Sequence, residues 1–293
     1  MGMRAKAPGA RAPGPRPLPG VLVWRHLCSR YEGCVLEYRR ALAACVRRLS
    51  RPAVHRLRVA IRRLLTCLEL LRAAGRKSPA VRHNLKRQLG ALGALRDTQV
   101  QLRVIRSEHQ NGAAMRPLVR HLRRLRRGAA KAAQKALESA KTLRRLTQFD
   151  PGLVPGSARE TMRLREFIEG RMQQTMGALA SLSSSSRAGS ARRHRARVRM
   201  RKFYFVMEAL KPVWHGDKDG RLSSSLHGCQ GIIGQMHDRE LLLRRIGRLV
   251  SEGRLPKSSA RPFCTRLKSE KAGQLRACRP LVRRALAESR ARR

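Results

Sequence analysis

The sequence predicts an all-α protein made of two antiparallel four-helix bundles related by an internal pseudo-two-fold duplication. Three observations support this fold class. Apolar residues follow the period of an amphipathic helix from Val21 onward, without sustained strand-like alternation. Clusters of Gly, Pro, Asn and Ser divide this periodic part into eight helix-sized pieces. Two blocks of the first half recur in the second half at nearly one offset.

The chain divides into a leader and two halves. Residues 1–20 are almost entirely Ala, Pro, Gly and Arg, a composition typical of a disordered basic segment. The first half, residues 21–150, and the second half, residues 151–293, each contain four of the helical pieces. Short connections between long helices favour antiparallel neighbours, so we expect each half to be a four-helix bundle. The expected connections lie at residues 50–52, 75–79, 111–112, 150–156, 183–190, 214–220 and 251–256.

The two repeated blocks occur in the same order in both halves. His55–Arg63 follows the pattern H-R-x-R-V-x-apolar-R-basic, and His194–Lys202 repeats it 139 residues later. Leu85–Ile105 is matched by Leu226–Ile246 at an offset of 141, with two glycines, one aspartate and a Leu-Arg pair in equivalent positions. Two matching blocks at nearly one offset indicate that the chain is a duplicated four-helix unit.

The first repeated block separates apolar and basic side chains when it is wound as a helix. One face is apolar and predicts the core, and the opposite face carries His55, Arg58 and Arg62. The second block has the same geometry, with His194, Arg197 and Arg201 on its basic face. We call these two sets the first and the second basic row. Members of a row lie about one turn apart, roughly 5 to 6 Å, a spacing that suits guanidinium groups binding successive phosphates.

A row of charges on a helix is often only a solvated surface. We accept that interpretation for the basic runs at residues 123–127 and 290–293, because surface charge usually serves solubility. The repeated rows differ, since like charges one turn apart destabilise a helix. The only acid in line with each row, Glu69 or Glu208, lies two turns beyond its nearest Arg. We therefore expect both rows to be functional and to line one basic cavity or groove.

The charge of the chain is extreme. Lys and Arg number 67 against 18 Asp and Glu, which gives a formal net charge of +49. Such a charge opposes compaction, so we expect a polyanionic partner to neutralise part of it. The hydrophobic fraction of 42% is large enough for a real core, which excludes a purely disordered basic protein.

Several other kinds of site are disfavoured. The seven cysteines are scattered and form no CxxC pair, so we expect reduced, mostly buried thiols and no zinc or redox motif. No HExxH or ExxH pair is present, and we expect neither a metal nor a cofactor. No apolar run approaches the roughly 18 residues that span a bilayer, and residues 21–24 are too short for a signal-peptide core. We expect a cytoplasmic protein without a membrane partner.

The two repeated blocks resemble the signatures of the CHAD domain, the conserved histidine α-helical domain. Val54–Arg63 resembles its signature H-x-[LM]-R-V-x-x-R-R, and Leu89–Asp97 resembles L-G-x-[LM]-R-D in one of two possible frames. The resemblance extends over residues 21–293. It implies two four-helix bundles with pseudo-two-fold symmetry and a basic cavity between or along them. It also implies binding of inorganic polyphosphate and association with polyphosphate granules.

The basic rows and this resemblance together predict a polyphosphate site made by both halves. The candidate binding residues are His55, Arg56, Arg58, Arg62, Arg63, Lys86, Arg96, His194, Arg195, Arg197, Arg201, Lys202 and His237. We expect no catalytic residue and no enzymatic activity. The ExExK signature of the CYTH module, a triphosphate-processing barrel that accompanies many CHAD domains, is missing, so a stand-alone binding domain is expected.

The sequence departs from the family pattern in three places. Leu65 and Tyr204 stand where the family commonly has a further basic residue, so each row is one charge shorter. His237 stands where the first copy has Arg96, which replaces a permanent cation with a titratable group. The adjacent aspartates, Asp97 and Asp238, are expected to orient neighbouring arginines by ion pairing rather than to act in catalysis.

Two other functions fit part of the sequence. A sequence-nonspecific nucleic-acid-binding protein is the main alternative, because a charge of +49 ensures salt-sensitive affinity for phosphate backbones. Aromatic residues make up only 3%, and Trp24, Tyr38, Phe203 and Phe205 lie in apolar patterns typical of a core, not of a base-stacking surface. His237-Asp238 suggests a metal-dependent HD phosphohydrolase, but no cluster of carboxylates and imidazoles accompanies it. Nonspecific nucleic-acid binding in vitro is expected.

Overall fold

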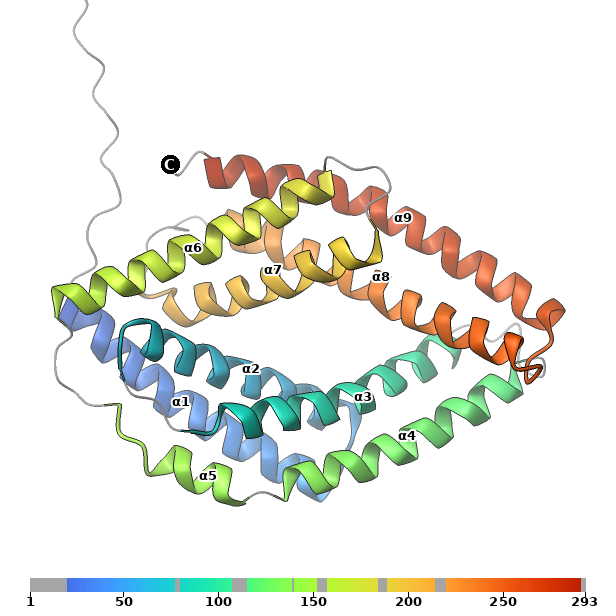
Figure 1. The fold of residues 1–293 in the computed structure, drawn as a ribbon, viewed down its shortest axis with the longest axis horizontal. Coiled ribbons are helices and arrows are strands. Elements are labelled where there is room, and N and C mark those ends of the chain that lie inside the picture. The colour runs from blue at the N-terminus through green and yellow to red at the C-terminus, as the bar shows by residue number, and fades with distance from the viewer. Residues whose placement is uncertain are drawn as a thin grey trace, which may run out of the picture.

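The structure is a computed structural model that describes residues 20–76, 80–106, 115–138, 140–151, 157–183, 189–213 and 220–290. Within these ranges the chain forms α-helices and no β-strand, which confirms the predicted all-α class (Figure 1). Nearly all of the predicted leader, at residues 1–19, and several predicted connections lie outside the described residues.

Most ends of the described helices lie at or near the predicted connections. In the first half they are α1 (Gly20–Arg47), α2 (Arg51–Ala73), α3 (Arg82–Arg106), α4 (Arg116–Leu137) and α5 (Ala140–Thr147). In the second half they are α6 (Ala158–Ser183), α7 (Ser190–Leu210), α8 (Arg221–Ser251) and α9 (Lys257–Arg290).

One predicted helix is divided in two. The fourth predicted piece forms α4 and the short α5, and the chain turns between them so that α5 contacts α1 (Figure 1). At this contact the Tyr31 hydroxyl donates a hydrogen bond to the Leu146 carbonyl oxygen at 2.9 Å, and the Leu146 side chain is buried. The turn therefore buries an apolar residue and gives a buried hydroxyl an acceptor, which a straight α4 would not do.

Both ends of α2, the helix that carries the first basic row, are determined by local sequence. The Ser50 hydroxyl accepts a hydrogen bond from the Ala53 amide at 3.3 Å, and Pro52 occupies the first turn, where no helical donor is lost. Gly75 ends the helix with a φ of +91°, a conformation that glycine adopts without steric cost. These two signals determine where α2 begins and ends.

The two halves share their apolar cores. Consecutive helices pack as the pairs α1/α2, α3/α4, α6/α7 and α8/α9, and the halves meet where α2 contacts α7 and α3 contacts α8 (Figure 1). One buried cluster joins α1 to α3 with Leu164 and Ile168 of α6 and Val206 of α7. Another joins Leu122 of α4 with Phe263 of α9. Neither half therefore encloses all of its apolar surface by itself.

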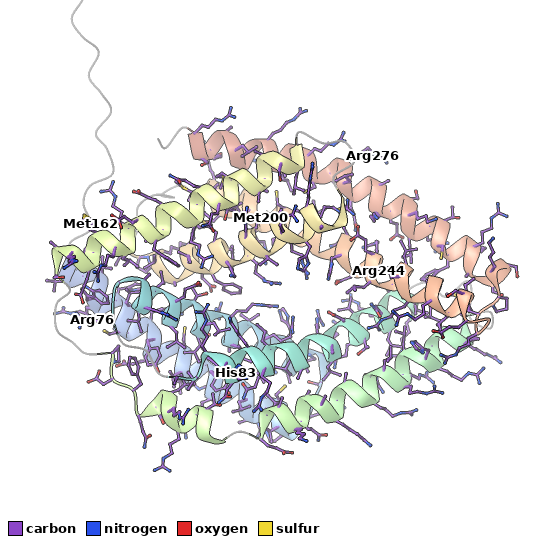
Figure 2. The ribbon with its side chains drawn as sticks, in the orientation of Figure 1. Arg76, His83, Met162, Met200, Arg244 and Arg276 are labelled. Carbon is purple, nitrogen blue, oxygen red and sulfur yellow. The ribbon has the colours of Figure 1, made fainter. Side chains whose placement is uncertain are left out.

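The predicted core faces are confirmed. Leu57 and Ile61 of α2 and Met200 and Phe203 of α7 are fully buried. Figure 2 shows Met200 inside the second half, whereas Arg276 extends from α9 at the outer surface. The aromatic side chains predicted to belong to the core are buried, namely Trp24, Tyr38, Phe203 and Phe205.

The structure also bears on the predictions about the cysteines and about membrane-spanning helices. All seven cysteines are free thiols, and all are buried except the half-buried Cys264, as predicted. Among the described helices, none combines the length and the apolar character required for a membrane span.

Candidate functional site

The two basic rows lie side by side in the structure. Because α2 packs against α7, Arg58 and Arg62 of the first row lie close to Arg197 and Arg201 of the second. Burial and the nearby Arg201, Arg58 and Arg197 lower the pKa of Arg62 to about 8. Burial, together with Arg197 and Arg58, lowers the pKa of Arg201 to about 10. We call these four residues the arginine cluster.

The arginine cluster holds positive charge that the protein compensates poorly. A guanidinium keeps its proton at neutral pH, so a lowered pKa here means that burial and like-charged neighbours disfavour its charge. Each cluster member is half-buried, which weakens screening by water compared with a fully exposed arginine. An anion placed among these four groups would relieve their repulsion and accept charge-assisted hydrogen bonds from them.

A glycine of α3 makes room for one cluster member. The Arg58 Nη1 atom donates a hydrogen bond to the Leu89 carbonyl oxygen at 2.9 Å. A Cβ atom on Gly93 would lie 3.1 Å from that Nη1 atom, which is tighter than nearly all real contacts of a Cβ atom. Gly93 therefore lets the guanidinium of Arg58 lie directly against the backbone of α3.

The two aspartates lie near the cluster without pairing directly. Within the described residues neither Asp97 nor Asp238 takes part in an ion pair, so the predicted ion pairing is not seen. The guanidinium of Arg58 contacts a carbonyl oxygen instead. Burial raises the pKa of Asp238 to about 6, Arg197 opposes this shift, and Asp97 adds to it. The aspartates thus moderate the positive field from a distance.

Histidines lie at the edge of the cluster. Burial and the nearby Arg96, Arg62, Arg58 and Arg51 lower the pKa of His55. Burial and Arg197 also lower the pKa of His237, whose ring centre lies 5.8 Å from that of His194. No group of three His, Cys, Asp or Glu side chains that could hold a metal ion occurs in the described part of the chain.

The remaining candidates lie in two different environments. Arg96 of α3 is half-buried, and burial and Arg51 lower its pKa. Lys202 has a pKa lowered by burial and Arg171, with Lys86 nearby. The side chains that are largely exposed are those of Arg56, Lys86, Arg195 and Lys202.

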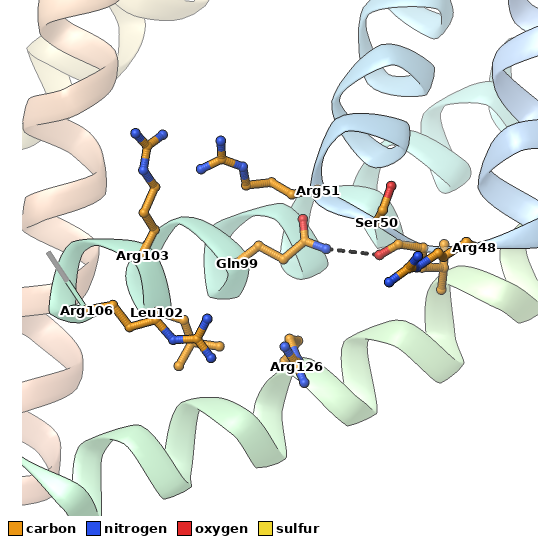
Figure 3. Close-up of a pocket in the computed structure, with 9 residues that line it drawn as sticks. Arg48, Ser50, Arg51, Gln99, Leu102, Arg103, Arg106 and Arg126 are labelled. Carbon is orange, nitrogen blue, oxygen red and sulfur yellow. Dashed lines mark hydrogen bonds between the residues drawn. The ribbon is translucent and has the colours of Figure 1, made fainter.

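An arginine-lined cavity lies beside the basic rows and contains none of the predicted residues. It has a volume of about 690 Å³ and lies where the α1–α2 connection meets α3 and α4 (Figure 3). Its lining residues are Arg48, Leu49, Ser50, Arg51, Gln99, Leu102, Arg103, Arg106 and Arg126.

Sequence reasoning missed this cavity although part of its signal was present. Arg51 lies four residues before His55, so it extends the first basic row by one turn. Gln99, Arg103 and Arg106 follow Arg96 at intervals of three and four residues, which places all of them on one face of α3. Following the face of Arg96 along its repeated block would have identified Gln99 and Arg103, and extending both faces beyond the blocks would have added Arg51 and Arg106.

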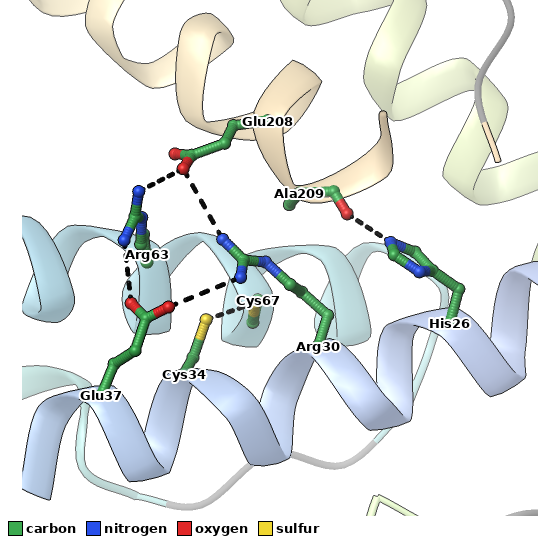
Figure 4. Close-up of polar contacts among 8 residues, drawn as sticks. All are labelled: His26, Arg30, Cys34, Glu37, Arg63, Cys67, Glu208 and Ala209. Carbon is green, nitrogen blue, oxygen red and sulfur yellow. Dashed lines mark hydrogen bonds and ion pairs between the residues drawn. The ribbon is translucent and has the colours of Figure 1, made fainter. Parts of the chain in front are cut away.

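Arg63 is placed differently from the prediction, because carboxylates already occupy its guanidinium. Its Nη1 atom donates to Glu37 at 3.0 Å, and its Nη2 atom donates to Glu208 of α7 (Figure 4). Arg30 of α1 lies 3.7 Å from the same two carboxylates. Beside this network, His26 Nε2 lies 2.7 Å from the Ala209 carbonyl oxygen. Arg63 therefore joins α1, α2 and α7 and holds the two basic rows in position.

We expect Glu208→Gln to destabilise the protein by about 1 to 3 kcal/mol, because it leaves Glu37 as the one carboxylate paired with two partly buried guanidinium groups, those of Arg30 and Arg63. Urea unfolding followed by circular dichroism measures this change. The matched control is Glu169→Gln, which removes an exposed carboxylate paired with Arg165 within one helix. That substitution is expected to cost less than about 0.5 kcal/mol. Equal losses for the two variants would contradict the role assigned to Glu208.

Comparisons with known proteins identify one family and two solved structures with a similar fold. The family model described as the CHAD domain matches residues 33–247. A crystal structure of the CHAD domain from the plant Ricinus communis is similar with a TM-score of 0.67 and 18% identity, over 95% of this chain and 97% of that one. PptA from Streptomyces chartreusis is similar with a TM-score of 0.67 and 17% identity, over 90% and 99%. No curated protein matches by sequence.

Proposed function

Because this chain belongs to the CHAD domain family, we propose that it binds inorganic polyphosphate along its two basic rows. The observation that carries this proposal is the arginine cluster, in which two arginines from each half repel one another in a partly buried position. A polyanion with closely spaced charges would bridge all four groups, whereas one small anion would neutralise only part of them. The proposed role is binding, without a catalytic residue.

We further propose that the two halves, residues 21–150 and 151–293, descend from one duplicated four-helix unit. The repeated blocks support this origin, as do the contacts between the equivalent helices α2 and α7 and between α3 and α8. Under this proposal a polyphosphate chain lies near the pseudo-two-fold axis and is bound by equivalent side chains from both halves. We place the protein in the cytoplasm at polyphosphate granules.

A nucleic-acid function is less well supported by the surface. Single-strand binders stack bases on exposed aromatic rings, whereas the rings predicted to belong to the core, those of Trp24, Tyr38, Phe203 and Phe205, are buried here. The general positive charge still attracts nucleic acids, but that attraction is weakened strongly by salt.

A competition experiment tests the proposed function. Long-chain polyphosphate, single-stranded DNA and heparin would each displace labelled polyphosphate from the protein at about 150 mM salt, where exposed charges are largely screened. The proposal predicts that polyphosphate competes at least tenfold better per charge than the other two polymers. Equal competition by all three would mean that binding reflects net charge alone.

Polyphosphate binding is expected to tighten as the pH falls from 7 to 5. Asp238, with a pKa of about 6, loses its negative charge in this interval next to Arg197. His55 and His237, whose pKa values are lowered, gain positive charge toward the end of it. Both changes make the site more positive, so the affinity should rise several-fold. Affinity measured between pH 5 and pH 8 checks the expectation.

The Asp238→Asn variant separates the contribution of Asp238 to the pH dependence of binding from the contribution of the histidines. This variant is expected to bind polyphosphate more tightly than the wild type at pH 7 and to show a flatter pH profile, because its charge no longer changes. Glu166→Gln is the matched control, since it removes an exposed carboxylate of α6. Weaker binding by Asp238→Asn at pH 7 would contradict the expected sign.

A further inference from the structure

The arginine-lined cavity concentrates positive charge. Among its lining residues that the structure describes, five of nine are arginines and none is acidic. They come from the α1–α2 connection, α2, α3 and α4, so four segments of the fold converge on one space (Figure 3). Within the part of the chain that the structure describes, none of these five arginines takes part in an ion pair. The cavity therefore has the chemistry of an anion site.

The positive charge is continuous between the cavity and the basic rows. Arg51 lines the cavity and also lies one turn from His55, and it contributes to the lowered pKa of His55 and of Arg96. Arg103, on the same face of α3 as Arg96, contributes to the lowered pKa of Arg96 as well. From Arg62 to Arg51 the path along α2 is about 16 Å, at 1.5 Å per residue. A flexible polyanion held at the rows could follow this face into the cavity.

The equivalent region of the second half lacks this concentration of positive charge. The repeat places Ser190 at the position of Arg51 and Gly247 at the position of Arg106, so two arginines have no equivalent. It also places Glu240 at the position of Gln99. Glu240 forms ion pairs with Arg193 and with Lys271, the latter at 3.1 Å. The second half thus supplies a carboxylate and fewer arginines where the first half has an open basic cavity.

We propose that this cavity is a second polyanion subsite, which takes the phosphates of a long polyphosphate chain beyond those bound at the basic rows. This inference rests on the proposed function and extends it. The polyphosphate chain extends from the basic rows into the first half only, so the combined site is asymmetric although the sequence contains a repeat. Chains that are too short to reach from the arginine cluster to the cavity bind at the rows alone.

Two polyphosphates of different length test this inference on the full-length protein. Tripolyphosphate occupies one subsite at most, and long-chain polyphosphate occupies both. The test variant is Arg51→Gln/Arg103→Gln/Arg106→Gln, in which all three side chains are exposed. The matched control is Arg276→Gln/Arg279→Gln/Arg283→Gln on α9, which removes the same charge from three exposed side chains. Figure 2 shows Arg276 at the outer surface.

The expected result is a loss that depends on chain length. Relative to the control, the cavity variant should bind long-chain polyphosphate at least tenfold more weakly and tripolyphosphate less than about threefold more weakly, because charge-assisted contacts are lost only with the long chain. Arg103→Gln alone, which changes one exposed side chain, should lose about threefold on the long chain. Circular dichroism verifies that both variants keep their helices.

Three other outcomes overturn the inference, and they distinguish failure of the subsite alone from failure of the proposed function. If Arg62→Glu weakens both ligands while the cavity variant matches its control on both, the polyphosphate function stands and the second subsite is wrong. A cavity variant that weakens tripolyphosphate and the long chain equally has the same consequence. If the wild-type protein binds neither ligand at about 150 mM salt, the proposed function fails, and the subsite fails with it.

Discussion

Arg62→Glu should weaken polyphosphate binding at least tenfold. Arg62 lies half-buried among Arg58, Arg197 and Arg201, where a guanidinium can make forked, partly desolvated contacts with phosphate. A charge-assisted contact of this kind contributes about 1.5 to 3 kcal/mol, and the introduced carboxylate also repels the ligand. Titration with polyphosphate of defined length measures the loss. Arg201→Glu, at the equivalent position of the second row, should give a similar result.

The matched control for this prediction is Arg124→Glu. Arg124 is exposed on α4, and its reversal changes the net charge by the same amount. Long-range attraction is therefore equal in the two variants. An exposed charge contributes less than about 1 kcal/mol, so a loss of only a few-fold is expected, and most of it should vanish at higher salt. Equal losses for Arg62→Glu and Arg124→Glu would mean that a diffuse positive surface binds the polymer. Arg292, in the basic run at residues 290–293, lies outside the described residues.

Arg62→Met should stabilise the ligand-free protein while it removes binding. The pKa of Arg62 is lower in the folded protein than in an unfolded chain, so its positive charge at neutral pH disfavours the folded state. Replacing buried ionic groups with well-packed apolar side chains of similar volume is often neutral or stabilising, by about 1 to 4 kcal/mol where it stabilises. Thermal unfolding without polyanion should therefore occur several degrees higher in this variant.

Polyphosphate should reverse the order of the melting temperatures of the wild type and Arg62→Met. A ligand at one hundred times its dissociation constant stabilises the folded state by about 2.7 kcal/mol, so saturating polyphosphate should raise the melting temperature of the wild type by several degrees. Arg62→Met should respond much less. Arg124→Met is the control and should behave like the wild type with and without the ligand. A ligand-free Arg62→Met protein that is less stable than the wild type would contradict the repulsion assigned to the cluster.

Most of the fold could be predicted because its signals are local. Ser50, Pro52 and Gly75 fix the ends of α2, and apolar periodicity identifies the side of α2 that carries Leu57 and Ile61. The separation of α5 from α4 could not be predicted in this way. It depends on a contact between Tyr31 and Leu146, which are 115 residues apart and have no shared local pattern.

The residues of the candidate site could be predicted where a sequence pattern repeats. They could not be predicted where tertiary packing determines their surroundings. The repeat identified Arg58, Arg62, Arg197 and Arg201, and the helix contacts bring them together. Periodicity could not show that Arg63 faces Glu37 and Glu208, since those carboxylates belong to other helices. It likewise could not show that the α1–α2 connection, α3 and α4 enclose a basic cavity. Which element covers a given face is a property of tertiary packing.

The number of polyphosphate sites per protein tests the central claim, that one site is built from both halves. Calorimetric titration with a short polyphosphate at about 150 mM salt would be carried out on the wild type, Arg62→Glu and Arg201→Glu. The account predicts one bound chain per wild-type protein and a similar, at least tenfold loss of affinity at that single site in each variant. Two chains per protein, with one site lost and the other unchanged in each variant, would contradict it.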